Sequence, residues 1–119
     1  MLRLSGERDE INVVSDQIGS PTYAGDLASA IHTIISDKNW QPGIYHFTNE
    51  GVASWYDFTK AIFEIAGKST RVNPIPTAQY PTPAKRPLYS VLSKNKIKQN
   101  YGITIPYWRD SLAECLKKL

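Results

Sequence analysis

The spacing of hydrophobic positions along the chain predicts helices that alternate with short strands. Apolar residues recur at intervals of three and four, as on one helix face, at Leu27, Ile31, Ile34 and Ile35. Similar patterns and turn residues predict further helices over 54–66, 93–101 and 107–119, and short strands over 11–14, 43–48 and 71–75. Strands separated by helices favour an α/β fold, although so few strands make an incomplete sheet.

The helix over 54–66 has the clearest end signals. Ser54 is followed three residues later by Asp57, which is a variant of the capping box, and Gly67 suits the position just past the helix end. Its apolar face is expected to consist of Trp55, Phe58, Ile62, Ile65 and Ala66.

Other boundaries depend on single residues. Thr22 is expected to cap the helix that follows it, and Gly102 should end the short basic helix before it. Pro74 lacks a backbone donor, so its strand should lie at the edge of a sheet. Residues 1–10 look like the end of a helix whose beginning is missing, because Leu2 and Leu4 have nothing local to pack on.

Composition restricts the chain to one small folded domain over residues 1–119. Its 119 residues, 41% hydrophobic and 21% charged, are ordinary for a folded protein with one core. The net charge of +3 fits a small anionic ligand at least as well as nucleic acid. The single cysteine, Cys115, excludes an internal disulfide. No apolar run approaches a membrane span and the start has no signal peptide, so we expect a cytoplasmic protein.

The most informative segment is the proline-rich stretch over 80–87. Three prolines stiffen the backbone around Lys85 and Arg86, just before a polar run that opens at Ser90. A preordered loop with a guanidinium suits a phosphate or carboxylate ligand, because arginine donates in a planar fork. On the residues alone, a plain connector with solvated charges is an equally good interpretation.

A second candidate segment is the turn from Asp16 to Thr22, between a predicted strand and a predicted helix. Ligands of open α/β sheets bind at such turns, near the positive end of a helix. Gln17 could recognise a base or a sugar hydroxyl, and Ser20 or Thr22 could donate to an anion. The simpler interpretation, in which Thr22 only caps the helix, is favoured by the residues alone.

Other patterns point away from catalysis in this chain. Tyr56 and Lys60 have the Tyr-x-x-x-Lys spacing of short-chain dehydrogenases, but they stand in the first turn of an amphipathic helix, so we interpret the match as accidental. His32 and His46 have no acidic or cysteine neighbours at metal spacing. The chain also lacks the Gly-x-Gly-x-x-Gly fingerprint of dinucleotide binding.

Three lysines follow the proline-rich stretch, at Lys94, Lys96 and Lys98. A nucleic-acid surface is one interpretation of this charge. No interleaved aromatic residues or binding motif accompany the lysines, so a solvated helix face is favoured over nucleic-acid binding.

Read together, the segments resemble the C-terminal portion of the dTDP-4-dehydrorhamnose reductases, a family of extended short-chain dehydrogenases/reductases. The matching segments are 1–4, 16–28, 43–46, 54–58, 80–87, 89–90 and 107–109. The resemblance implies an enzyme that reduces dTDP-4-dehydro-L-rhamnose to dTDP-L-rhamnose with NAD(P)H, for cell-surface polysaccharide such as O-antigen. It also implies that the Rossmann half, with the catalytic residues and the glycine fingerprint, is missing here.

The resemblance assigns the chain to the substrate-binding lobe, without catalytic, cofactor-binding or metal-binding residues of its own. An arginine at the position of Arg86 pairs with the diphosphate in related nucleotide-sugar enzymes, and Lys85 would assist. The remaining candidate substrate-binding residues are Asp16, Gln17, Thr22 and Ser90. A free-standing binding or interaction module without catalysis is the alternative, and self-association into a homo-oligomer through a free sheet edge stays open.

Overall fold

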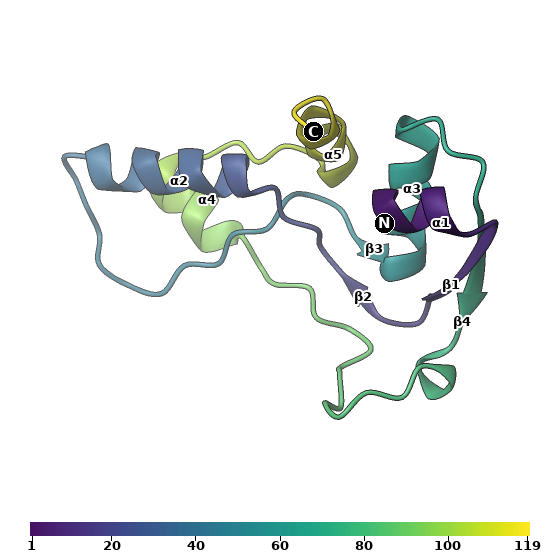
Figure 1. Cartoon of the computed structure of the whole chain (residues 1–119). Helices are drawn as coiled ribbons and strands as arrows, with labels where there is room; N and C mark the ends of the chain where they lie inside the picture. The colour runs from purple at the N-terminus through teal and green to yellow at the C-terminus, as the bar shows by residue number, and fades with distance from the viewer.

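Two groups of helices lie at opposite ends of an elongated molecule (Figure 1). The structure is a computed structural model that describes residues 1–119. The radius of gyration is 16.7 Å and the principal extents are 52 × 33 × 20 Å, whereas a compact chain of this length would have a radius of gyration of about 13.5 Å. The chain therefore spreads its residues over two small clusters instead of one round core.

Helices and short strands are interspersed along the chain, which confirms the α/β prediction. They are α1 (Leu2–Glu7), β1 (Glu10–Val14), β2 (Ile18–Gly19), α2 (Ala24–Ser36), β3 (Ala53–Ser54), α3 (Trp55–Ile65), β4 (Arg71–Ile75), a 3-10 turn (Thr77–Gln79), α4 (Asn95–Tyr101) and α5 (Trp108–Leu116). β1 pairs with β4 in parallel, and β2 pairs with β3 in an antiparallel ladder. No helix is both long and apolar enough to cross a membrane.

The larger cluster forms around α3, where local signals and packing agree. Ser54 Oγ accepts the Asp57 N–H at 3.0 Å while Asp57 Oδ2 accepts the Ser54 N–H at 2.9 Å, which confirms the capping box. Gly67, just past the helix, has φ +62°, a left-handed conformation that glycine adopts freely. Nine buried hydrophobic residues pack together here: Ile11, Val13, Ala53, Ala61, Ile62, Phe63, Val72, Trp108 and Leu112.

The buried face of α3 differs from the predicted one. Its buried residues are Thr59, Ala61, Ile62 and Phe63. Trp55 is 53% exposed and Ile65 is 37% exposed, so the prediction was wrong for both. The helix turns its Thr59–Phe63 side toward β1, β4 and α5, which leaves Trp55 and Ile65 at the surface.

β1 and β4 form one side of this cluster. Ile11 is paired with Val72, and both are buried, while their neighbours Glu10 and Arg71 are exposed. Pro74 stands opposite Val13 and β4 has β1 as its one ladder partner, as expected for an edge strand.

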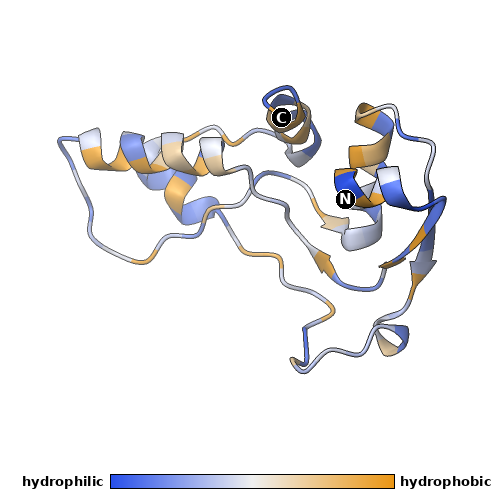
Figure 2. Cartoon of the chain, viewed as in Figure 1, coloured by the Kyte–Doolittle hydropathy of each residue, from blue (hydrophilic) through white to orange (hydrophobic).

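The smaller cluster joins α2 to α4. Its three buried residues are Ile97, Tyr101 and Ile105, with Ile34 of α2 packed against them. Gly102 ends α4 with φ +61°, as predicted. Figure 2 shows hydrophobic residues along α2, yet Ala30 is the only residue of this helix that is buried.

The predicted strand over 43–48 was wrong, because this segment joins no ladder. Tyr45 and Phe47 pack against the smaller cluster while His46 is exposed. Alternate residues therefore face the protein interior, which gives a strand-like sequence pattern without a strand partner.

Two predicted helix ends were also wrong. Tyr23, not Thr22, is the N-cap of α2, and its N–H donates to Asn49 Oδ1 at 2.7 Å. The Thr22 hydroxyl lies instead 3.5 Å from the Ser20 carbonyl oxygen. The last helix stops at Leu116, and Leu119 is 87% exposed.

Candidate functional site

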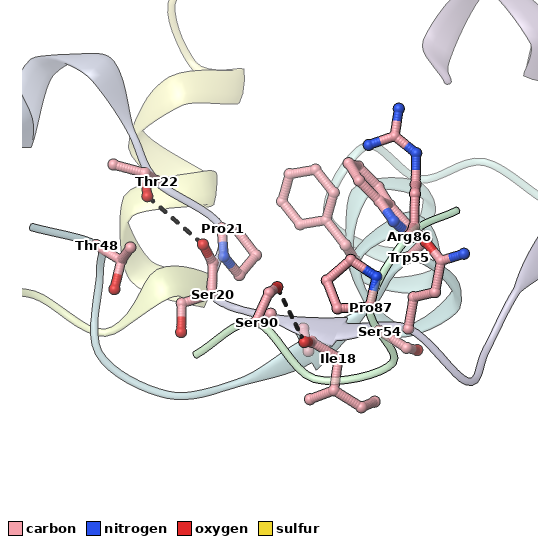
Figure 3. A pocket seen from close by; sticks show the side chains of 14 residues that line it. Ile18, Ser20, Pro21, Thr22, Thr48, Ser54, Trp55, Arg86, Pro87 and Ser90 are labelled. Carbon is pink, nitrogen blue, oxygen red and sulfur yellow. Dashed lines mark hydrogen bonds between the residues drawn. The ribbon is translucent and has the colours of Figure 1, made fainter. Parts of the chain in front are cut away.

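A cavity of about 560 Å³ lies where the proline-rich stretch meets β2 and the start of α3 (Figure 3). The stretch is attached to β2 by two backbone bonds: the Ile18 N–H donates to the Leu88 carbonyl at 2.8 Å, and the Ser90 N–H donates to the Ile18 carbonyl at 2.9 Å. Residues separated by about 70 positions in sequence are thereby held together. This attachment places Arg86, Pro87 and Ser90 in the cavity wall.

Hydroxyl groups make up much of the lining. They belong to Ser20, Thr22, Thr48, Ser54 and Ser90. Most of their protons are already directed at protein acceptors, such as the Gly51 carbonyl for Ser20 at 2.7 Å and Asp57 Oδ2 for Ser54 at 2.7 Å. These oxygens therefore remain mainly acceptors for a ligand, which suits sugar or nucleoside hydroxyls better than an anion.

Arg86 is the one charged side chain that lines this cavity. It is exposed and forms no ion pair or side-chain hydrogen bond with the rest of the chain. A guanidinium without a protein partner keeps all its donors for a ligand. The cavity thus combines one free cation with neutral acceptors, and no lining carboxylate opposes an anion.

A second cavity, of about 890 Å³, lies against α1, β1 and the first half of the proline-rich stretch. Gln17, Trp55 and Arg86 line both cavities. A ligand whose charged group contacts Arg86 could therefore extend into either cavity.

Asp16 and Gln17 together hold the turn that leads into the proline-rich stretch. Asp16 accepts the Thr77 hydroxyl at 2.6 Å and the Thr77 N–H at 2.9 Å, and these bonds hold the pKa of the Asp16 carboxyl below its ordinary value. Gln17 Nε2 donates to Thr77 Oγ1 at 3.1 Å. Gln17 lines the cavities, whereas Asp16 lines neither.

The predicted site residues therefore occupy different environments. Arg86, Gln17, Thr22 and Ser90 meet in the first cavity. Lys85 is exposed and lines neither cavity. Tyr56, of the accidental Tyr-x-x-x-Lys match, packs against the hydrophobic cluster while Lys60 is exposed.

Sequence reasoning missed Trp55, Thr48 and Ser54 as cavity residues. Trp55 fits the spacing of an apolar helix face, and Ser54 was assigned only to the capping box. A tryptophan at the first helical position, next to a capping serine, was the available signal. Thr48 gave no signal of its own.

The three lysines after the proline-rich stretch are not a freely solvated face, and that prediction was wrong. Lys94 is buried, donates to the Asn49 carbonyl at 3.2 Å and forms an ion pair with Glu50 at 3.2 Å. Lys98 pairs with the same carboxylate, and the hydrogen bond from Lys98 is the main reason that the pKa of Glu50 is lowered. Lys96 Nζ donates to the Ile44 carbonyl at 3.0 Å. Their charge is used within the chain, which weakens the nucleic-acid interpretation.

A comparison with protein-family models matches residues 1–119 to the RmlD substrate binding domain. The chain belongs to this family. The chain is 45% identical to the spore coat polysaccharide biosynthesis protein SpsK of Bacillus subtilis, over 99% of this chain and 40% of that protein. It is 48% identical to a dTDP-4-dehydrorhamnose reductase of Aggregatibacter actinomycetemcomitans, covering 94% of this chain and 42% of that protein.

The fold of the chain also matches a solved structure. The crystal structure of a dTDP-4-dehydrorhamnose reductase from Bacillus anthracis in complex with NADP superposes with a TM-score of 0.93 at 38% identity. The match covers 99% of this chain and 41% of that one. The chain thus spans about 40% of the length of these relatives.

Proposed function

We propose that this chain is the dTDP-sugar-binding part of an NAD(P)H-dependent reductase that converts dTDP-4-dehydro-L-rhamnose to dTDP-L-rhamnose. The observation that carries the proposal is Arg86, a guanidinium without a protein partner at the junction of two cavities. Family membership and relatives named as dTDP-4-dehydrorhamnose reductases support the substrate class. The reaction would take place in the cytoplasm and supply a precursor of cell-surface polysaccharide.

In this proposal the chain binds and orients the substrate. Arg86 holds the diphosphate, where fixed donors match its charge. Gln17 and the acceptor hydroxyls of Thr22 and Ser90 contact the uncharged parts of the ligand. Asp16 acts through Thr77, by holding the turn that begins the proline-rich stretch, and Lys85 adds positive charge beside Arg86.

The residues present do not fit a nicotinamide dinucleotide. A dinucleotide-binding turn needs closely spaced glycines between a strand and a helix, so that the backbone can approach the pyrophosphate. Gly19 and Gly25 flank the β2-to-α2 turn, but the space beside Gly25 is taken by the Tyr23 ring, 2.6 Å from where a Cβ would stand. The cofactor and the catalytic residues would therefore come from a Rossmann half, the remaining part of the longer relatives.

Calorimetry with dTDP tests the role of Arg86. We expect Arg86→Ala to weaken dTDP binding by about 10- to 100-fold, because charge-assisted hydrogen bonds are lost. Arg86→Lys should recover part of the affinity, since a lysine supplies charge without the planar fork. Arg71→Ala, which removes an exposed arginine outside both cavities, is the matched control and should bind dTDP as the wild type does. Equal affinity of the wild type and Arg86→Ala would remove Arg86 from the site.

An activity assay tests whether the chain binds the substrate without catalysing its reduction. The isolated chain should bind dTDP without oxidising NADPH in the presence of the dTDP-4-keto sugar. Turnover by the isolated, folded chain at the rate of a complete reductase would overturn the proposal.

A further inference from the structure

Trp55 stands at a capped helix start without being buried. It is the first residue of α3, directly after Ser54, whose reciprocal bonds with Asp57 lock the helix start. The indole is 53% exposed, while the buried side of α3 begins at Thr59. A large aromatic side chain on a rigid helix start, with about half of its surface uncovered, is available for a ligand.

The position of the indole relative to Arg86 restricts what it can contact. Both side chains line both cavities, and Figure 3 shows them on the same side of the first cavity, across from Thr22 and Thr48. The indole therefore lines whichever cavity is entered by the groups next to a diphosphate that contacts Arg86.

We propose that the indole of Trp55 stacks on the nucleobase of a nucleoside diphosphate, a step that rests on the proposed function. A nucleobase is flat and has a π-face, so it can cover an indole plane over its whole area. A hexose in a chair conformation offers only axial C–H groups to the same plane.

The second aromatic residue of the first cavity is less available for this role. Phe58 packs against the hydrophobic cluster, with its ring centre 6.0 Å from that of Trp108. Trp55 is the exposed aromatic residue of this cavity, whereas Phe58 is half-buried. It would therefore determine preference for nucleotides over simple diphosphates.

Two ligands separate the role of Trp55 from that of Arg86: dTDP, and inorganic pyrophosphate, which has no base. In calorimetric titrations we expect Trp55→Ala to weaken the affinity for dTDP by about 5- to 100-fold, which is the range for loss of one stacked base. The affinity for pyrophosphate should stay unchanged. Trp55→Phe should keep most of the dTDP affinity, because it keeps an aromatic face. Trp40→Ala is the matched control, since Trp40 is 61% exposed and lines neither cavity.

Each alternative has its own outcome. If Trp55→Ala weakens both ligands equally, the indole only positions Arg86 or the fold; circular dichroism of each variant identifies a folding defect. If Trp55→Ala changes neither affinity, the indole faces another polypeptide. A loss seen with dTDP-glucose but not with dTDP would assign the indole to the sugar. All three results overturn the stacking proposal.

Failure of the proposed function gives a different pattern. The proposed function fails if Arg86→Ala binds both pyrophosphate and dTDP as tightly as the wild type does. If Arg86→Ala weakens the affinity for dTDP and Trp55→Ala does not, only the stacking proposal is overturned. Absence of dTDP binding by the wild-type chain overturns both.

Discussion

Nine buried hydrophobic residues pack around α3, whereas only three pack around α4 at the other end of the molecule. The α2–α4 region is held in addition by polar groups. Asn49, fully buried, donates to Asp26 Oδ2 at 2.6 Å and to Ser111 Oγ at 2.9 Å, and accepts the Tyr23 N–H. Hydrogen bonds and ion pairs thus help to stabilise the α2–α4 region, whereas apolar packing stabilises the region around α3.

The candidate site lies between the two regions, and each region contributes residues to the cavity lining. Ser54, Trp55 and Phe58 belong to the α3 side, which apolar packing makes rigid. Ser20, Pro21 and Thr22 are contributed by the turn directly before Tyr23, whose N–H is held by Asn49. The geometry of the cavity therefore depends on two kinds of force, and these can be perturbed separately.

The largest effect is expected from the α3 region. Phe63 is 3% exposed within the nine-residue cluster. Phe63→Ala should lower the free energy of unfolding by about 3–5 kcal/mol, through lost burial and a residual cavity. Urea denaturation measures the change.

An exposed apolar residue of the other region is the control for this substitution. Ile35 on α2 is 70% exposed, so Ile35→Ala should change the free energy of unfolding by less than about 0.5 kcal/mol. Equal losses in the two variants would mean that α2 is covered in solution and that the contrast between the regions is wrong.

A smaller effect is expected from the polar network. Asn49→Ala leaves Asp26, Ser111 and the Tyr23 N–H without this partner, which should cost about 1–3 kcal/mol. It should also weaken dTDP binding, because the turn before Tyr23 loses its anchor. Urea denaturation and calorimetry measure the two effects.

Asn39→Ala is the matched control, because the Asn39 side chain is exposed and should change neither stability nor binding. If Asn49→Ala were less stable but bound dTDP as the wild type does, the hydrogen bonds of Asn49 would not be needed for the geometry of the candidate site.

The features that were predictable from sequence are those whose partners are close in sequence. Ser54 and Asp57 form a capping box three residues apart, and Gly67 and Gly102 end helices by their own backbone freedom. β1 and β4 are an exception, because they pair with each other although they lie far apart in sequence. Hydrophobic pattern and turn residues located each strand but not its partner.

The features that were missed depend on distant partners. Lys94 was expected in solvent, but its partners Asn49 and Glu50 lie more than 40 residues earlier. The exposure of Trp55 follows from how α3 packs on β1, β4 and α5, and no local spacing encodes that orientation. Arg86 was selected by resemblance, since composition alone left a solvated charge equally acceptable.

The smallest effect should be the pH dependence of the ion pairs at Glu50. The hydrogen bond from Lys98, and then that from Lys94, lowers the pKa of the Glu50 carboxyl below its ordinary value of 4.5. A lowered pKa in the folded state means that the ionised carboxylate stabilises the fold above the unfolded pKa. This contribution is lost as the pH falls below about 4.5 through the folded pKa.

Glu50→Gln isolates this contribution. At neutral pH the variant should unfold about 1 kcal/mol more easily than the wild type, because the pairs are partly exposed to solvent. The difference should shrink as the pH falls, since the wild type then loses the same charge. Glu64→Gln, which breaks the surface pair of Glu64 with Arg109 on the α3 side, should have a smaller effect at neutral pH. If both variants lost stability equally and at every pH, charge would contribute no more to the α2–α4 region than to the region around α3.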